Sequence, residues 1–186
     1  MRNIVLSLAG ALILGSAATQ SAHAADDSIR IREVIPYRSD SVGTAPIREQ
    51  CAWNRELSQN IVKASKGKVV ATDQELASLT GKTLDIVITY VHAAGGGSVS
   101  GPKWGRISGE LKENGQLIGN FDIQRVTMRP FTFKACSTLS LVADALADDV
   151  VAWLKNPSVD PNAGKAIPNG ETAPQASAQD QSASAR

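Results

Sequence analysis

Two runs of alternating residues, joined by an Asn-Gly pair, place the strongest constraint on how this chain folds. Residues 104–112 alternate small or apolar side chains with polar ones, and residues 117–126 do the same. Asn114-Gly115 lies between the runs, and both residues tolerate the positive φ that a tight hairpin turn requires. A third alternating run, residues 83–93, precedes them. The sequence therefore predicts an antiparallel three-strand meander that is covered on one face only.

The same alternation assigns side chains to the two faces of this meander. Tyr90 has the same parity as Leu84, and Leu117 has the same parity as Phe121, so all four are expected on the apolar face. Charged side chains of the second and third strands are expected to form cross-strand ion pairs on the polar face: Arg106, Glu110, Asp122 and Arg125.

Two segments have the periodicity of amphipathic helices. Residues 47–65 carry large apolar side chains every four residues, beginning at Trp53. A second helix is expected to begin at Ser137 or Thr138, which can cap it, and to end near Leu154. Both helices have one apolar stripe, so each is expected to pack against the sheet.

Shorter elements are predicted before the meander. Residues 29–37 suit a strand at a sheet edge, because Pro36 limits how far it can pair. Residues 68–71 suit another short strand, and residues 72–75 have the Thr and Glu spacing of a capping box before a short helix. We therefore expect an α+β fold over residues 25–157, with a single mixed or largely antiparallel sheet and two long helices packed on one face.

The two ends of the chain differ from this predicted domain. Residues 1–24 have the pattern of a cleavable secretory signal: a basic start, an apolar run, and Ala22-His23-Ala24 before the cut. The run falls short of the roughly 20 residues that span a bilayer, so we expect a periplasmic protein with no integral membrane segment after cleavage. Residues 158–186, rich in Ala, Ser, Gln, Pro and Gly, are predicted to form a disordered tail.

Cys51 and Cys136 are the two cysteines of the chain. An even pair in an exported protein is most simply a disulfide, which would contribute about 4–5 kcal/mol in the chain-entropy model. The alternative is a reactive or metal-binding thiol. Two thiols and His92, the single histidine after the signal, give no recognisable ligand spacing, and we predict no metal site.

The overall composition disfavours several classes of partner. Lys and Arg number 19 against 18 Asp and Glu, so the near-neutral charge does not indicate a nucleic acid. Aromatic residues make up 4% of the chain, which argues against stacking platforms for bases or sugars. No cofactor is expected.

A glycine-rich segment, residues 95–101, precedes the predicted hairpin. It is not a phosphate-binding loop, because Pro102 stands where that motif requires lysine. It suits a flexible link between strands or, alternatively, a recognition loop. The candidate binding surface built around it comprises Gly95, Gly96, Gly97, Lys103, Trp104, Arg106 and Arg125.

No catalytic constellation emerges from the sequence. Ser98 lacks the second glycine and the strand–turn–helix context of a nucleophile elbow. His92 could serve as a base for Ser98 or Cys51, which keeps a divergent hydrolase as the least favoured alternative. We predict a protein that is not an enzyme.

The layout resembles a family of small α/β envelope domains. The resemblance is carried by the hairpin, residues 105–111 with the Asn114-Gly115 turn, and by the closing residues 142–150. These are similar to the TolB amino-terminal domain and to CsgG-like and LpoB-like accessory proteins, over about residues 29–157. The chain departs from the lipoprotein members because it lacks a lipidation cysteine. The resemblance implies a non-enzymatic role in binding another envelope protein; the alternative is a binder of small ligands or envelope polymers that uses residues 95–101.

Overall fold

The computed structural model describes residues 27–93, 102–127 and 135–163. The predicted signal peptide, the glycines at 95–101 and most of the predicted tail lie outside these residues. The elements, in chain order, are β1 (Ile29–Arg32), α1 (Ala45–Gln50), α2 (Trp53–Ala64), β2 (Val69–Thr72), the 3-10 helix η1 (Leu76–Ser78), β3 (Lys82–His92), β4 (Lys103–Glu113), β5 (Gln116–Thr127) and α3 (Ala135–Trp153).

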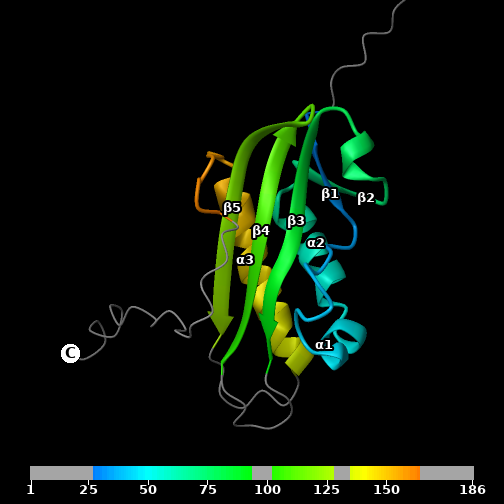
Figure 1. Ribbon diagram of the computed structural model, residues 1–186, viewed down its shortest axis with the longest axis vertical. Coiled ribbons are helices and arrows are strands. Elements are labelled where there is room, and N and C mark those ends of the chain that lie inside the picture. Colours follow the sequence, from blue (N-terminus) through cyan, green and yellow to red (C-terminus); the bar gives the residue numbers. More distant parts are fainter. Residues whose placement is uncertain (1–26, 94–101, 128–134, 164–186) are drawn as a thin grey trace, which may run out of the picture.

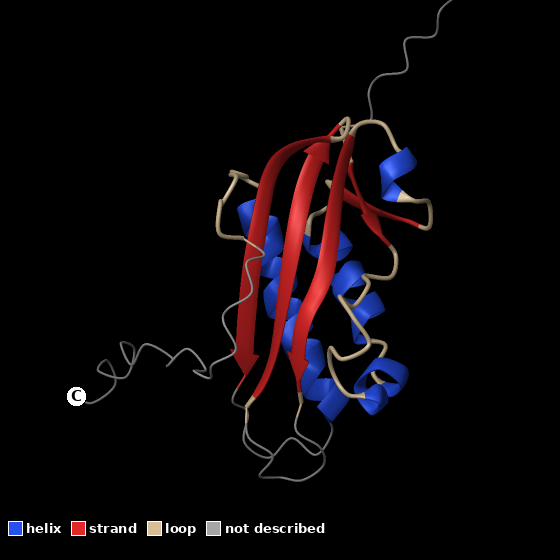
Figure 2. Cartoon of the chain, viewed as in Figure 1, coloured by secondary structure: helices blue, strands red, loops and turns tan. Residues whose placement is uncertain are grey.

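One mixed sheet runs through the molecule in the order β2-β1-β3-β4-β5. β1 is parallel to both of its neighbours, whereas β3, β4 and β5 form the predicted antiparallel meander. α2 and α3 cover one face of the sheet and leave the other face uncovered (Figures 1 and 2). The predicted α+β fold with two long helices on one face is therefore confirmed. None of the helices in the described residues is long and apolar enough to span a membrane.

The core lies between the sheet and the two helices. Trp53 is fully buried, and its indole N–H donates to the carbonyl of Leu139 at 2.7 Å, so α2 and α3 are fixed to one another at this point. The inward positions of β4 alternate glycine with larger residues, because the rings of Trp53 and Phe121 occupy the space beside the glycines. A Cβ on Gly105 would lie 2.8 Å from the Trp53 ring, and one on Gly109 would overlap the ring of Phe121.

The Asn114-Gly115 turn and the disulfide are both confirmed. Asn114 and Gly115 have φ angles of 51° and 82°, as the tight turn between β4 and β5 requires. Cys51 and Cys136 are bonded across a sequence separation of 85 residues. The bond joins the segment between α1 and α2 to the first turn of α3.

The helix predicted over residues 47–65 is divided into α1 and α2. The break falls at Cys51 and Ala52, and Ala52 has a φ of 22°. This turn lets Cys51 reach Cys136 while Trp53 enters the core. Helical periodicity alone does not reveal such a break, because both parts present apolar residues to the same core.

Two predictions about the first elements were wrong. β1 is not an edge strand but lies between β2 and β3, and Pro36 follows its end without interrupting it. The capping box does not form: the hydroxyl of Thr72 accepts from the amide of Gln74, and the Glu75 carboxylate binds Arg32 at 2.9 Å. A full charge on Arg32 outcompetes a backbone amide for this carboxylate.

Shifts of register reverse two of the predicted face assignments. Between Ile88 and Tyr90 the pairing of β3 with β4 shifts, so Tyr90 is 44% exposed and Val91 faces the core. A second shift in the β4–β5 pairing leaves Leu117 39% exposed, opposite Lys112. A β-bulge adds one residue to one strand, and every side chain beyond it changes face.

Candidate interaction surface

The uncovered face of β3, β4 and β5 carries the candidate site. At the end of this face where β4 begins, three aromatic side chains form what we call the aromatic ladder: Tyr90, His92 and Trp104. His92 lies directly opposite Trp104 in the pairing of β3 with β4, and their ring centroids are 4.2 Å apart with planes inclined by 16°. Tyr90 stacks on Trp104 from the next position, at 6.1 Å and 15°. Each ring restricts its neighbour, so the ladder is a preorganised surface.

Arg106 adds a charged group beside the ladder. Its guanidinium forms an ion pair with Asp122 on β5, whose other carboxylate oxygen accepts a hydrogen bond from Ser108 at 3.1 Å. The predicted cross-strand pairing on the polar face is confirmed for these two charges. Val126, which lies opposite Trp104, is 42% exposed and extends the apolar area of the ladder onto β5.

The structure divides the predicted binding surface between the two faces of the sheet. Trp104 and Arg106 lie on the uncovered face, whereas Lys103 and Arg125 lie on the helix side, because side chains alternate along β4 and β5. Lys103 is 4% exposed. Gly95, Gly96 and Gly97 lie outside the described residues.

Arg125 has a structural partner on α3. On the helix side its guanidinium binds the carboxylate of Asp149, and this hydrogen bond raises the pKa of Arg125. The cross-strand pair expected of Arg125 is therefore wrong, because its side chain lies on the helix side of β5. Glu110 also pairs within its own strand, with Lys112 at 2.7 Å.

Sequence reasoning singled out Trp104 and His92 but not the ladder they form with Tyr90. The missing information was the register between β3 and β4, which a tight turn does not specify here, and the bulge that turns Tyr90 to the uncovered face. The low aromatic content gave no indication of the ladder, since the fold gathers these three side chains in one place.

A hollow of about 720 Å³ lies on the same face, toward its middle. Its floor includes Val87, Ser108 and Glu110, and its walls come from the residues after β1 and from Pro161 and Ala163. It is lined by both polar and apolar groups and opens to solvent.

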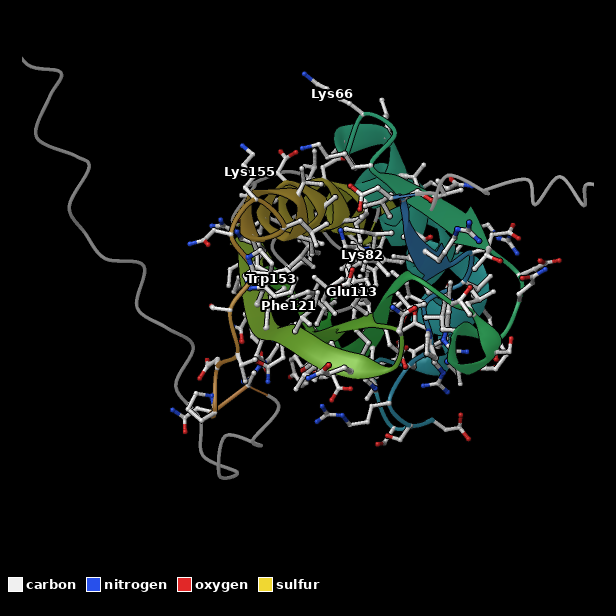
Figure 3. All side chains as sticks on the ribbon, turned by 90° about the horizontal axis from the view of Figure 1, so that it is seen from above. Lys66, Lys82, Glu113, Phe121, Trp153 and Lys155 are labelled. Atoms are coloured by element: carbon white, nitrogen blue, oxygen red, sulfur yellow. A yellow bond between two sulfur atoms is a disulfide. The ribbon has the colours of Figure 1, made fainter. Side chains whose placement is uncertain are left out.

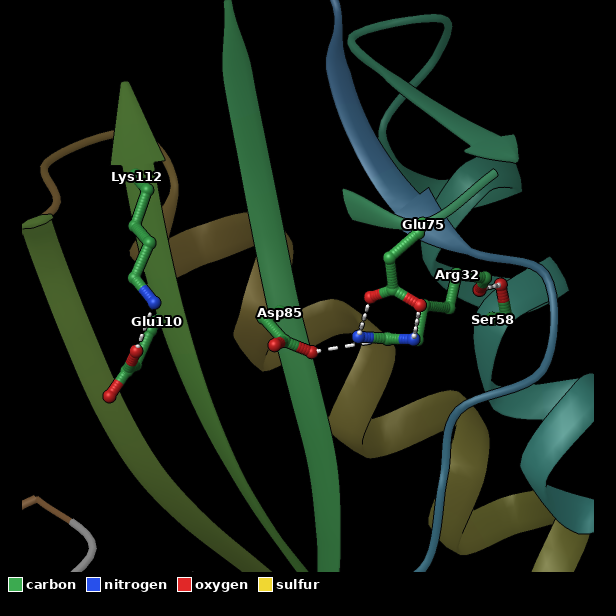
Figure 4. Close-up of polar contacts among 6 residues, drawn as sticks. All are labelled: Arg32, Ser58, Glu75, Asp85, Glu110 and Lys112. Carbon is green, nitrogen blue, oxygen red and sulfur yellow. Dashed lines mark hydrogen bonds and ion pairs between the residues drawn. The ribbon is translucent and has the colours of Figure 1, made fainter. Parts of the chain in front are cut away.

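Two carboxylates face each other across this floor, and each has its own cation. Asp85 lies opposite Glu110 in the β3–β4 pairing. Arg32 binds Asp85 at 3.4 Å and Glu75 at 2.9 Å, and these contacts, with Glu75 the larger cause, raise the pKa of Arg32 (Figure 4). The hydrogen bond from Lys112 to Glu110 likewise raises the pKa of Lys112. Among the described residues, no group of three or more potential ligands could hold a metal ion.

Comparisons with known proteins identify no family for this chain. No family model matches it, and no curated protein matches it either. Among solved structures, a protein of Xanthomonas campestris described by the family DUF330 aligns with 12% identity and a TM-score of 0.44, over 68% of this chain and 82% of that one. The PelC dodecamer of Paraburkholderia phytofirmans aligns with 14% identity and a TM-score of 0.45, over 68% of this chain and 85% of PelC. Scores this low assign no function, and the resemblance to TolB-type domains stays a prediction.

Proposed function

We propose that this chain is a non-enzymatic accessory protein of the cell envelope, which binds another protein through the uncovered face of its sheet. The signal-like pattern of residues 1–24 supports a periplasmic location. The Cys51–Cys136 disulfide also supports export, because such bonds persist in oxidising compartments. The sequence resemblance to TolB-type and LpoB-like domains agrees with an accessory role.

The observation that carries the proposal is the aromatic ladder. Tyr, Trp and Arg dominate the energetic centres of protein interfaces, and Tyr and Trp bury much area at little cost in conformational entropy. Here Tyr90, Trp104 and Arg106 lie together, held by stacking and by the ion pair to Asp122. A partner would cover this apolar area without reordering it.

Crosslinking in intact cells, followed by identification of the proteins attached, tests this proposal. We expect one reproducible envelope partner in the wild type and its loss in Tyr90→Arg. Leu117→Arg is the matched control: Leu117 is exposed to a similar degree on the same face, at the far end of the sheet. This control variant should retain the partner, and both variants should melt at the wild-type temperature.

Two results would overturn the proposal. One is a partner that survives Tyr90→Arg and also Val126→Arg. The other is turnover of a substrate by the purified protein that His92→Ala or Ser98→Ala abolishes.

The hollow on the uncovered face favours a second candidate function, the binding of a small ligand or an envelope polymer. Its volume of about 720 Å³ lies in the range typical of ligand sites. A ligand of this kind raises the melting temperature. Val87→Trp, which places a large side chain in the floor of the hollow, should abolish that rise. A site formed instead by residues 95–101, as the sequence suggests, predicts that shortening this segment abolishes the rise. An unchanged rise in both variants would exclude this face as the binding site.

A further inference from the structure

A second hollow lies on the helix side, where α2 and α3 end, and it differs in character from the first. It measures about 280 Å³. Its floor is apolar: Ile29 of β1, Ala64 at the end of α2, and Val151 and Leu154 at the end of α3. All four are only partly buried, so the ends of the two helices leave apolar surface open between them.

Three exposed lysines form the rim of this hollow: Lys66, Lys68 and Lys155. Figure 3 shows Lys66 and Lys155 on the helix side of the molecule. Within the described ranges none of the three forms an ion pair, whereas Lys82 and Lys112 are paired with Asp27 and Glu110. The rim therefore brings together three positive charges, none of which forms an ion pair with a described carboxylate.

The helix dipole explains part of this arrangement. Cations are favoured near the carboxyl end of a helix, and Lys66 and Lys155 follow the ends of α2 and α3. The dipole does not account for Lys68, which lies just before β2, nor for the apolar floor that the lysines surround. Apolar floor and cationic rim together match a ligand that has an aliphatic body and an acidic head.

We propose that this hollow binds an anionic amphiphile, with the aliphatic chain against Val151 and Leu154 and the carboxylate or phosphate head among the rim lysines. The attraction between the acidic head and the lysines is strongest where the ligand's aliphatic chain excludes water from the floor, because fewer solvent molecules then screen the charges. The site is separate from the aromatic ladder, and this inference does not rest on the proposed function.

Calorimetric titration with matched small amphiphiles tests the proposal on the full-length protein. Decanoate and decyl phosphate are expected to bind. Decyltrimethylammonium, which has the same chain and the opposite charge, and inorganic phosphate, which has the head alone, are expected not to bind. Equal binding of the cationic amphiphile, or of inorganic phosphate, would overturn the proposal.

Charge reversal at the rim locates the site. Lys66→Glu combined with Lys155→Glu should weaken decanoate binding about tenfold, as expected for reversing two partly screened charges. Lys63→Glu is the control, since Lys63 is exposed on α2, the helix that Lys66 follows, but does not line the hollow. Equal weakening by Lys63→Glu, or no weakening by the double variant, would show that the ligand binds elsewhere.

Filling the floor tests the apolar half of the site without changing any charge. Ala64→Leu enlarges a side chain that lines the hollow, and it should weaken decanoate binding while leaving the rim intact. Tyr90→Arg should leave this binding unchanged, so a failure here is distinguishable from a failure of the proposed protein interaction. Undiminished binding in Ala64→Leu would contradict the assigned floor.

Discussion

The two faces of the sheet are constrained by different properties of their side chains, although they share the same strands. On the helix side, β4 presents Gly105, Ile107, Gly109 and Leu111, all buried, and the rings of Trp53 and Phe121 leave no space for a Cβ at the two glycines. On the uncovered face the same strand presents Trp104, which stacks against Tyr90 and His92, and charged residues held by ion pairs. The helix side is therefore sensitive to volume, and the uncovered face to charge and contact area.

This contrast predicts that substitutions of equal size have unequal consequences on the two faces. Removal of a side chain from the helix side leaves a cavity, whereas removal from the uncovered face exposes atoms that water already reaches. The disulfide reinforces the difference, because it joins two segments on the helix side. Stability and binding should thus be separable by mutation.

The largest effect is expected from a pair of tryptophan variants. Trp53→Ala should lower the free energy of unfolding by about 3–5 kcal/mol, because it removes a fully buried ring and its hydrogen bond to Leu139. Trp104→Ala, on the uncovered face, should cost about 1 kcal/mol, the order of a stacked aromatic pair. Urea unfolding of both variants measures the difference. Equal losses would show that the two faces do not differ in this way.

Loss of the disulfide should have the next largest effect. Cys51→Ser with Cys136→Ser should lower the free energy of unfolding by about 2–5 kcal/mol, because the unfolded chain is released from a long closed loop. Partner binding through the aromatic ladder should persist at temperatures where the variant remains folded. Denaturant melts with and without reductant provide the measurement, and reductant should not alter the double variant.

A smaller effect distinguishes neighbouring positions on β4. Gly109→Ala should cost about 1–3 kcal/mol, because its Cβ would overlap the ring of Phe121 and force it to move. Ser108→Ala, the adjacent residue on the uncovered face, should cost about 1 kcal/mol through loss of its hydrogen bond to Asp122. A smaller loss in Gly109→Ala than in Ser108→Ala, measured by thermal melting, would contradict the tight packing described for the helix side.

The smallest effect concerns Tyr37, which lines the hollow on the uncovered face. Burial raises the pKa of its hydroxyl, partly offset by Arg48, and this hydroxyl has no hydrogen-bond partner in the described part of the chain. Since the neutral form is favoured in the folded state, the folded protein holds this proton more tightly than the unfolded chain does. The contribution of the neutral Tyr37 hydroxyl to the free energy of unfolding is therefore fully present below about pH 10, and it is lost as the pH rises above that value.

Tyr37→Phe isolates this contribution. The variant should be as stable as the wild type near neutral pH, or more stable by up to about 1 kcal/mol, because it removes an unpartnered polar group. Above about pH 10 the stability of the variant should decline less steeply than that of the wild type. Hydrogen bonds to Asp27 and Glu110 raise the pKa values of Lys82 and Lys112. At alkaline pH these lysines lose their protons, and with them their ion pairs, in the wild type and in the variant alike, so they do not affect the comparison. Urea unfolding measures this difference. An equal decline of the free energy of unfolding with pH in the two proteins, above about pH 10, would contradict this account.

Patterns that depend on neighbouring residues were readable in the sequence. Alternation defined the three long strands, apolar stripes at helical spacing indicated α2 and α3, and Asn114-Gly115 fixed the turn between β4 and β5. The pairing of Cys51 with Cys136 followed because no other cysteine competes. Each of these signals is local or unambiguous, and none requires knowledge of how the elements pack.

The sites depended on contacts that no local pattern specifies. Trp104 and Arg106 were identified from the sequence, but Tyr90 joins them because a bulge shifts the β3–β4 register. The lysine rim combines residues after α2 with Lys155 after α3, which only the packing of the two helices brings together.

The sequence by itself thus determined the kinds of element, the meander, and the disulfide. The tertiary structure decided the interior place of β1, the break before α2, and which side chains share a surface. The physical reason is that periodicity reports the average environment of a segment. A bulge, a helix break or a hollow between helix ends instead arises from one-residue adjustments, and these are stabilised by contacts between residues far apart in the chain.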